Sequence, residues 1–313
     1  MKNIIYFYLL ALITAGCEGS AAYEKSKHGI ILKLDSGNLR LEVFSEHMVR
    51  LTYAPLSGFS TRESLVVVSK PEENVTWHIK ELEGMIILET ALIRVEIEPN
   101  SGMCRFTDAH GKTLLVENGR RMASYRVMDE DVNNVFQSFE LSPEEALYGL
   151  GQHQDGIMNW RGQEVTLVLT NVHAVIPFLV STNNYGILWD NCSKTIFKDD
   201  DSGASFWSEV ADQVDYYFIA GNNMDEVIDG YRTLTGAAPM FGNWAYGYWQ
   251  SKERYVNAED LMSVVKEYRE RKIPIDNVVQ DWNYWAEYDP ADGDKTWASA
   301  KENWSSMQYH PST

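Results

Sequence analysis

The chain has 313 residues and a net charge of −18, with 44% apolar and 12% aromatic residues. This apolar fraction is sufficient for packed cores and excludes a disordered chain. The strong negative charge argues against nucleic acid or an anionic membrane surface as a partner. At roughly 100–200 residues per domain, the length predicts two domains.

The first 17 residues have the pattern of an export signal. Lys2 precedes an apolar stretch over residues 4–15, and Gly16-Cys17 follows it. The stretch is too short and wrongly flanked for a transmembrane helix. Small residues before a cysteine resemble the bacterial lipoprotein signal, in which Cys17 is acylated, and plain secretion is the alternative. We therefore expect an exported protein, a periplasmic or cell-surface lipoprotein held to the membrane only by its lipid.

Cysteine and histidine spacing predicts neither a disulfide framework nor a metal site. The three cysteines, Cys17, Cys104 and Cys192, show no paired spacing. The seven histidines are scattered, with no H-x-x-x-H pair. His153, in the segment GQHQDG, is the most suggestive, but a loop histidine is usually an ordinary polar residue. We expect no metal and no other cofactor.

Short alternating strands separated by turn residues occupy residues 23–222. Spacing near ten residues without helical periodicity is typical of an antiparallel sandwich. The expected strands are Ile30–Leu34, Leu39–Phe44, Met48–Tyr53, Ser64–Val68, Trp77–Lys80, Met85–Glu89, Leu92–Ile97, Cys104–Thr107, Val165–Leu169, Ile176–Ser181, Tyr185–Trp189, Thr195–Phe197 and Val214–Ala220.

Residues 223–241 are expected to connect this domain to a second one. Met224–Leu234 reads as a short amphipathic helix, and the glycines and proline after it form a stiff connector. From residue 242, an aromatic strand at Trp244–Trp249 precedes a helix at Asn257–Lys272 and a strand at Ile275–Gln280. Strand, helix and strand in about forty residues form a βαβ unit with parallel strands.

The second of these strands ends in Gln280-Asp281-Trp282. In a β/α barrel the active site forms at the carboxyl ends of the strands. A carboxylate among indole rings there suits a sugar, because the rings stack on its C–H groups and the carboxylate accepts from its hydroxyls. The alternative is that the rings close a hydrophobic core and Asp281 caps a turn. The many aromatic residues of the chain agree with both interpretations.

Two groups of motifs resemble glycoside hydrolase family 31. The segments YGLGQHQ (148–154), IPF (176–178), YG (185–186) and LWDN (188–191) resemble its N-terminal sandwich, which is galactose-mutarotase-like. LTG (234–236), WAYGYWQS (244–251) and QDW (280–282) look like the start of its catalytic (β/α)8 barrel. YGLGQHQ, LWDN and QDWNYW are most similar to bacterial α-xylosidases. The implied activity is retaining hydrolysis of α-glycosidic bonds in an oligosaccharide, by an enzyme that could be oligomeric at full length.

The resemblance implies that the two catalytic aspartates lie on later barrel strands, beyond Thr313. A full barrel needs about 250 residues, and residues 242–313 supply only its beginning. We therefore expect an N-terminal fragment of an O-glycosyl hydrolase that is inactive by itself. Asp281 corresponds to the aspartate that holds sugar hydroxyls, Trp282 to a wall of that subsite, and Tyr255 to an aromatic lining it.

The sandwich loop after GQHQ is expected to reach over the barrel mouth through Asp155 and Trp160. Two other functions remain open at this point: an α-glucosidase of the same family, and a non-catalytic carbohydrate-binding sandwich. The βαβ unit argues against the binding module, which has no need of two parallel barrel strands.

Overall fold

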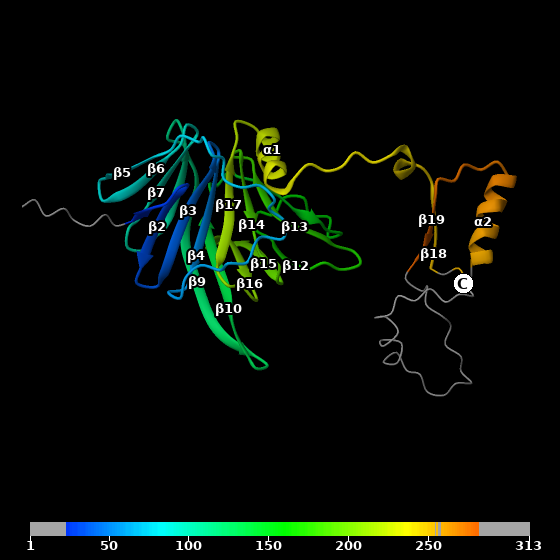
Figure 1. Cartoon of the computed structure of the whole chain (residues 1–313), viewed down its shortest axis with the longest axis horizontal. Coiled ribbons are helices and arrows are strands. Elements are labelled where there is room, and N and C mark those ends of the chain that lie inside the picture. The colour runs from blue at the N-terminus through cyan, green and yellow to red at the C-terminus, as the bar shows by residue number, and fades with distance from the viewer. Residues whose placement is uncertain (1–22, 254, 256–257, 282–313) are drawn as a thin grey trace, which may run out of the picture. The chain divides into compact units, whose positions relative to one another are not determined.

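The computed structural model describes residues 23–253, 255 and 258–281. The chain divides into two compact units, Met1–Ala237 and Ala238–Thr313. In the first unit, the described residues form two antiparallel sheets and one helix (Figure 1). In the second, they form two short strands, one helix and a short 3₁₀ turn.

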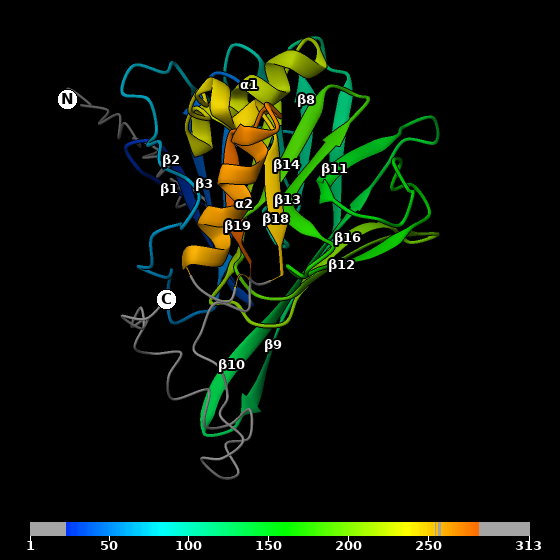
Figure 2. The same ribbon diagram turned by 90° about the vertical axis from the view of Figure 1, so that its right-hand side faces the viewer.

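The two sheets of the first unit lie face to face (Figures 1 and 2). One sheet has, in order, β1 (Glu24–Lys25), β2 (Gly29–Leu34), β3 (Gly37–Ser45), β4 (Met48–Ala54), β17 (Val214–Ala220), β14 (Tyr185–Trp189), β13 (Ala174–Ser181) and β11 (Leu147–Gln152). The other has β12 (Glu164–Leu167), β15 (Thr195–Asp200), β16 (Gly203–Ser208), β10 (Glu130–Glu140), β9 (Thr113–Val127), β8 (Cys104–Asp108), β7 (Ile93–Ile97), β6 (Met85–Glu89) and β5 (His78–Leu82).

Large aromatic side chains fill the space between the sheets. The rings of Phe106 and Phe218 stack with centroids 4.3 Å apart, and those of Trp189 and Phe206 stack at 5.2 Å. In each pair the two residues come from opposite sheets, and none of the four rings has exposed surface. Each such burial stabilises the fold by about 1.5–3 kcal/mol. The predicted sandwich is therefore confirmed.

One predicted strand is wrong: Ser64–Val68 is not in either sheet. The Ser64 hydroxyl accepts hydrogen bonds from the backbone N–H groups of Val66 and Val67, at 3.2 and 3.0 Å, which turns the chain. Val68 N–H then donates to Leu234 O at 2.8 Å. The run of valines therefore lies beside the last turn of the helix Met224–Thr235 and does not pair with a strand. Leu65 remains 82% exposed.

The sequence analysis does not predict four of the strands, β9, β10, β11 and β16. β9 and β10 form a hairpin whose outer half is polar and exposed. β11 contains a register shift between Gly149 and Gly151, both with positive φ. At Gly151 the neighbouring strand approaches closely, because a Cβ there would be 2.0 Å from Ala174 O.

Helix α1 (Met224–Thr235) covers the outer face of the eight-stranded sheet. Asn223 caps it, because its side chain accepts from Glu226 N–H at 3.0 Å. Val227 and Leu234 are fully buried in a cluster that includes Phe178 and Ile219 of the sheet. The helix expected as a connector thus packs on the first unit.

In the second unit, β18 (Trp249–Lys252) and β19 (Asn277–Gln280) pair in parallel, with α2 (Ala258–Glu270) between them in sequence. The predicted βαβ order is confirmed. The strand expected at Trp244–Trp249 is wrong except for Trp249, because the 3₁₀ turn η1 (Asn243–Tyr246) occupies its first part. The Trp249 indole donates to Ala245 O at 3.1 Å, which holds this turn against the strand.

Among the described residues, no helix is long and apolar enough to span a membrane.

Candidate functional site

The carboxyl ends of β18 and β19 meet at one edge. Lys252 and Gln280, the last residues of the two strands, are register partners. Asp281 directly follows β19, and Tyr255 follows β18 in the described part of the loop. The Tyr255 backbone N–H donates to Gln280 Oε1 at 3.0 Å. The structure therefore brings Tyr255 and Asp281 to the same edge, as the parallel pairing predicts.

The two side chains at this edge differ in burial. The Tyr255 ring is only 5% exposed, and Lys252 Nζ lies 5.0 Å from its centroid, in cation–π range. Lys252 Nζ also lies 3.5 Å from Asp260 Oδ2 in α2. The Tyr255 hydroxyl is buried, with no hydrogen-bond partner among the described residues. Asp281 is exposed.

Trp282 and Cys17 lie outside the described residues. Their expected roles, a subsite wall and a lipidated N-terminus, stay predictions. The described part of the edge therefore offers a carboxylate that accepts from hydroxyls, a tyrosine with an unsatisfied hydroxyl, and a lysine between them and α2.

Tyrosine and glutamine side chains hold α2 against β18. Both Tyr248 and Tyr268 donate their hydroxyls to Gln250 Oε1, at 2.8 and 2.6 Å. The two tyrosine oxygens are 3.1 Å apart, and this contact is the largest cause that raises the pKa of Tyr268. Gln250 was not identified from the sequence, because its role depends on two tyrosines 20 residues apart. This network fixes the strand that leads to Tyr255.

The loop before β18 is fixed by Asp276. Its carboxylate accepts from Tyr248 N–H at 3.0 Å. A Cβ at Gly247 would lie 2.1 Å from Asp276 Oδ2, so a larger residue there would displace this carboxylate. Asp276 is therefore a structural residue at the amino end of β19, opposite the edge with Asp281.

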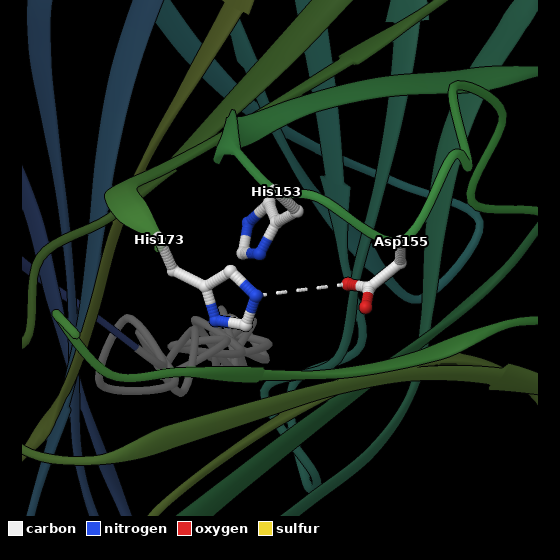
Figure 3. Close-up of side chains that lie close together, drawn as sticks. All are labelled: His153, Asp155 and His173. Carbon is white, nitrogen blue, oxygen red and sulfur yellow. Dashed lines mark ion pairs between the residues drawn. The ribbon is translucent and has the colours of Figure 1, made fainter. Parts of the chain in front are cut away.

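A second group of polar side chains lies in the sandwich. His153 and Asp155 follow β11, and His173 immediately precedes β13. One ligand atom from each of the three residues lies within 4.8 Å of the other two. His173 Nε2 is 4.0 Å from Asp155 Oδ2, and the two imidazole centroids are 5.0 Å apart. Figure 3 shows the two rings and the carboxylate turned toward one another. Among the described residues, this group has the composition to hold a metal ion.

Trp160 does not take the role expected for it. It is 3% exposed, its indole donates to Gly149 O at 3.0 Å, and its ring meets His153 edge to face at 5.4 Å. The expectation that this ring reaches outward from the loop is wrong, because it completes the core beneath His153. Asp155 in the same loop is exposed.

Both units of the chain match models of domains from one protein family. The glycosyl hydrolase 31 N-terminal galactose mutarotase-like domain matches residues 38–197, and the glycosyl hydrolases family 31 TIM-barrel domain matches residues 238–310. An alpha-xylosidase of Saccharolobus solfataricus is 37% identical over 268 residues, covering 82% of this chain and 36% of that protein. Alpha-glucosidase 2 of Bacillus thermoamyloliquefaciens is 26% identical over 289 residues, covering 85% of this chain and 35% of that protein.

Solved structures similar to this chain also include glycoside hydrolases of family 31. A GH31 alpha-xylosidase from a soil metagenome, complexed with xylose, superposes with a TM-score of 0.75 at 25% identity, covering 85% of this chain and 42% of that one. A GH31 dextranase of Flavobacterium johnsoniae, complexed with glucose, gives 0.71 at 25% identity, covering 84% and 34%.

A mutarotase-like antiparallel sandwich followed by the first strands of a TIM barrel defines a glycoside hydrolase architecture. The chain belongs to glycoside hydrolase family 31. It spans about a third of the length of the curated relatives named above.

Proposed function

We propose that the protein containing this chain is a retaining α-glycosidase that releases xylose from α-xylosides, such as the side chains of xyloglucan-type oligosaccharides. The observation that carries the proposal is the 37% identity to an alpha-xylosidase across 82% of the chain. The xylose-bound alpha-xylosidase among the similar structures supports it.

The proposed role of the edge formed by β18 and β19 is substrate binding. Asp281, exposed after β19, accepts hydrogen bonds from sugar hydroxyls. In this proposal Trp282, the next residue in the sequence, stacks on the sugar, and the buried ring of Tyr255 supports the edge from within. Retaining hydrolysis needs a nucleophile and an acid/base carboxyl roughly 5–5.5 Å apart, and we assign neither role to a residue of this chain.

An α-glucosidase is the second candidate, because alpha-glucosidase 2 of Bacillus thermoamyloliquefaciens matches 85% of the chain. A xyloside and a glucoside differ by the hydroxymethyl group at C5 of the sugar. A pocket built for one of them discriminates through the space at that carbon, so comparing the two substrates separates the candidates.

The test is the kcat/KM of the protein containing this chain on p-nitrophenyl α-xyloside and on the α-glucoside. We expect preference for the xyloside. Asp281→Asn removes a charged acceptor worth about 1.5–3 kcal/mol, which lowers kcat/KM roughly 10- to 150-fold.

The matched control is Glu270→Gln. Glu270 is also an exposed carboxylate of the second unit, but it ends α2 and leads toward the amino end of β19. It should keep full activity. Unchanged kcat/KM in Asp281→Asn would refute the binding role, and preference for the glucoside would refute the proposed substrate.

A further inference from the structure

We propose that His153, Asp155 and His173 form a binding site for one divalent transition-metal ion, with zinc as the first candidate. The site lies entirely within the sandwich. It does not depend on the proposed glycosidase activity, because its test measures metal binding.

The strand register creates the site. β11 and β13 are antiparallel, and Gln152 pairs with Ala174. The next residues in this register are His153 and His173. They therefore lie opposite each other on the two neighbouring segments, although 20 positions separate them in the sequence. Directly opposed side chains in such a pair have Cβ atoms about 4.5–5.5 Å apart. The close approach depends on Gly151, where a side chain would collide with Ala174 O.

One ring nitrogen of His153 has no hydrogen-bond partner among the described residues. Its Nε2 lies 2.9 Å from Leu150 O, but its Nδ1 is buried and has no hydrogen-bond partner among the described residues. The ring is fixed between Trp160 and His173. A histidine that only filled the core would be expected to have both nitrogens satisfied. Ligating histidines are usually oriented by further contacts of this kind, such as one to a backbone carbonyl.

The ligand set favours a transition metal over calcium or magnesium. Two imidazoles and one carboxylate are the protein ligands of zinc sites that keep a fourth position open, and of non-haem Fe(II) sites. Calcium and magnesium prefer oxygen ligands alone. The Asp155 carboxylate offsets one of the two positive charges of the ion.

The present distances require only a small closure. Ligand atoms each about 2.0–2.2 Å from zinc are at most about 4 Å apart, and the three atoms here lie within 4.8 Å. The Asp155 side chain is 50% exposed and that of His173 is 25% exposed. Both can rotate toward an ion at little cost in packing. A bound ion would tie the loop after β11 to the start of β13.

The first experiment is titration of the chelator-treated full chain with zinc chloride in a calorimeter. We expect one equivalent to bind saturably and to raise the Tm. Asp155→Asn and His173→Gln each remove one ligand at a partly exposed position and should weaken binding at least tenfold. A melting curve of each variant without zinc shows whether it is folded.

Two control variants separate this site from other ligands. His78→Gln changes an exposed histidine of β5, and Cys192→Ser removes the exposed thiol. Both should bind zinc like the unchanged chain. As an independent readout, Co²⁺ bound to the unchanged chain should show visible d–d absorption that disappears in His173→Gln.

Absence of saturable binding overturns the proposal. So does zinc binding that Asp155→Asn and His173→Gln both leave unchanged, since the ion would then sit elsewhere. If one of these variants does not fold, the other one decides.

Discussion

At the scale of single residues, the sandwich places two carboxylates, Asp190 and Asp215, close together where β14 ends and β17 begins. Asp215 is held by Arg50, whose Nε and Nη2 donate to it at 2.8 and 2.6 Å. Asp190 follows β14, and its backbone N–H donates to Asp215 O at 3.0 Å. Burial raises the pKa of Asp190, and the charge of Asp215 adds to the effect, against smaller opposing contributions from Ser64 and Arg50.

This shift makes Asp190 a source of pH-dependent stability. Its folded-state pKa is above the unfolded-state value, so the stabilisation is complete below the ordinary value of 3.8 and is lost as the pH rises through the folded pKa. At pH 7 the charged carboxylate therefore destabilises the fold. Asp190→Asn removes this cost and should raise Tm at pH 7.

The measurement is Tm as a function of pH for both proteins. The difference should disappear as the pH falls below 3.8, where Asp190 is protonated in both states. Asp131→Asn, at an exposed aspartate of β10, should leave Tm unchanged at both ends of the range. A variant with lower Tm at pH 7 would show that the carboxylate is instead stabilising.

At the scale of elements, the apolar pattern predicts strands well where both faces are buried. β6, β14 and β17 have the bounds expected from the sequence, because mostly apolar runs end there at turn residues. The sequence pattern does not reveal the β9–β10 hairpin, because most of its outer half is exposed and carries arginine, aspartate and asparagine. Burial periodicity cannot reveal a strand that extends into solvent.

The two candidate sites also differ in how far the sequence predicts them. The edge with Asp281 could be predicted, because one βαβ unit brings two strand ends together within a short segment. The cluster of His153 and His173 could not, because it depends on the register between β11 and β13, which a bulge shifts.

In helix α1, a substitution at Gly230 tests whether close packing on the sheet outweighs helix propensity. Gly230 is buried against the sheet, and a Cβ there would lie 2.5 Å from Cγ2 of Ile219, which is fully buried. Gly230→Ala improves helix propensity by about 1 kcal/mol, but overpacking costs about 1–3 kcal/mol. We expect a net loss of stability and a lower Tm.

The matched control is Asp229→Ala, the neighbouring position on the exposed side of α1. It gains helix propensity without a new contact, so its Tm should be equal or higher. If Gly230→Ala were the more stable of the two variants, the close packing of α1 on β17 would be wrong.

At the scale of the whole molecule, the apolar cores lie within one unit. Both hydrophobic clusters consist of residues between Tyr23 and Leu234. In the second unit, α2 has no buried residue in the described structure, and Trp249 and Met262 are about half exposed. Among the described residues, β18 and β19 pair only with each other, and unpaired strand edges invite pairing between chains. We therefore expect the first unit to carry most of the stability and the second to lower the solubility.

This difference predicts the behaviour of a shortened chain of residues 23–237. Because it keeps both clusters and α1, it should unfold in one cooperative transition with a Tm within about 2–4 °C of the full chain, a shift equivalent to no more than about 1 kcal/mol. It should also remain soluble at concentrations where residues 23–313 aggregate, which light scattering measures. A shortened chain without a cooperative transition would mean that residues after Ala237 are needed to complete the sandwich core. Equal aggregation of the two would place the sticky surface on the sandwich, where the exposed edge strand β5 is the first region to examine.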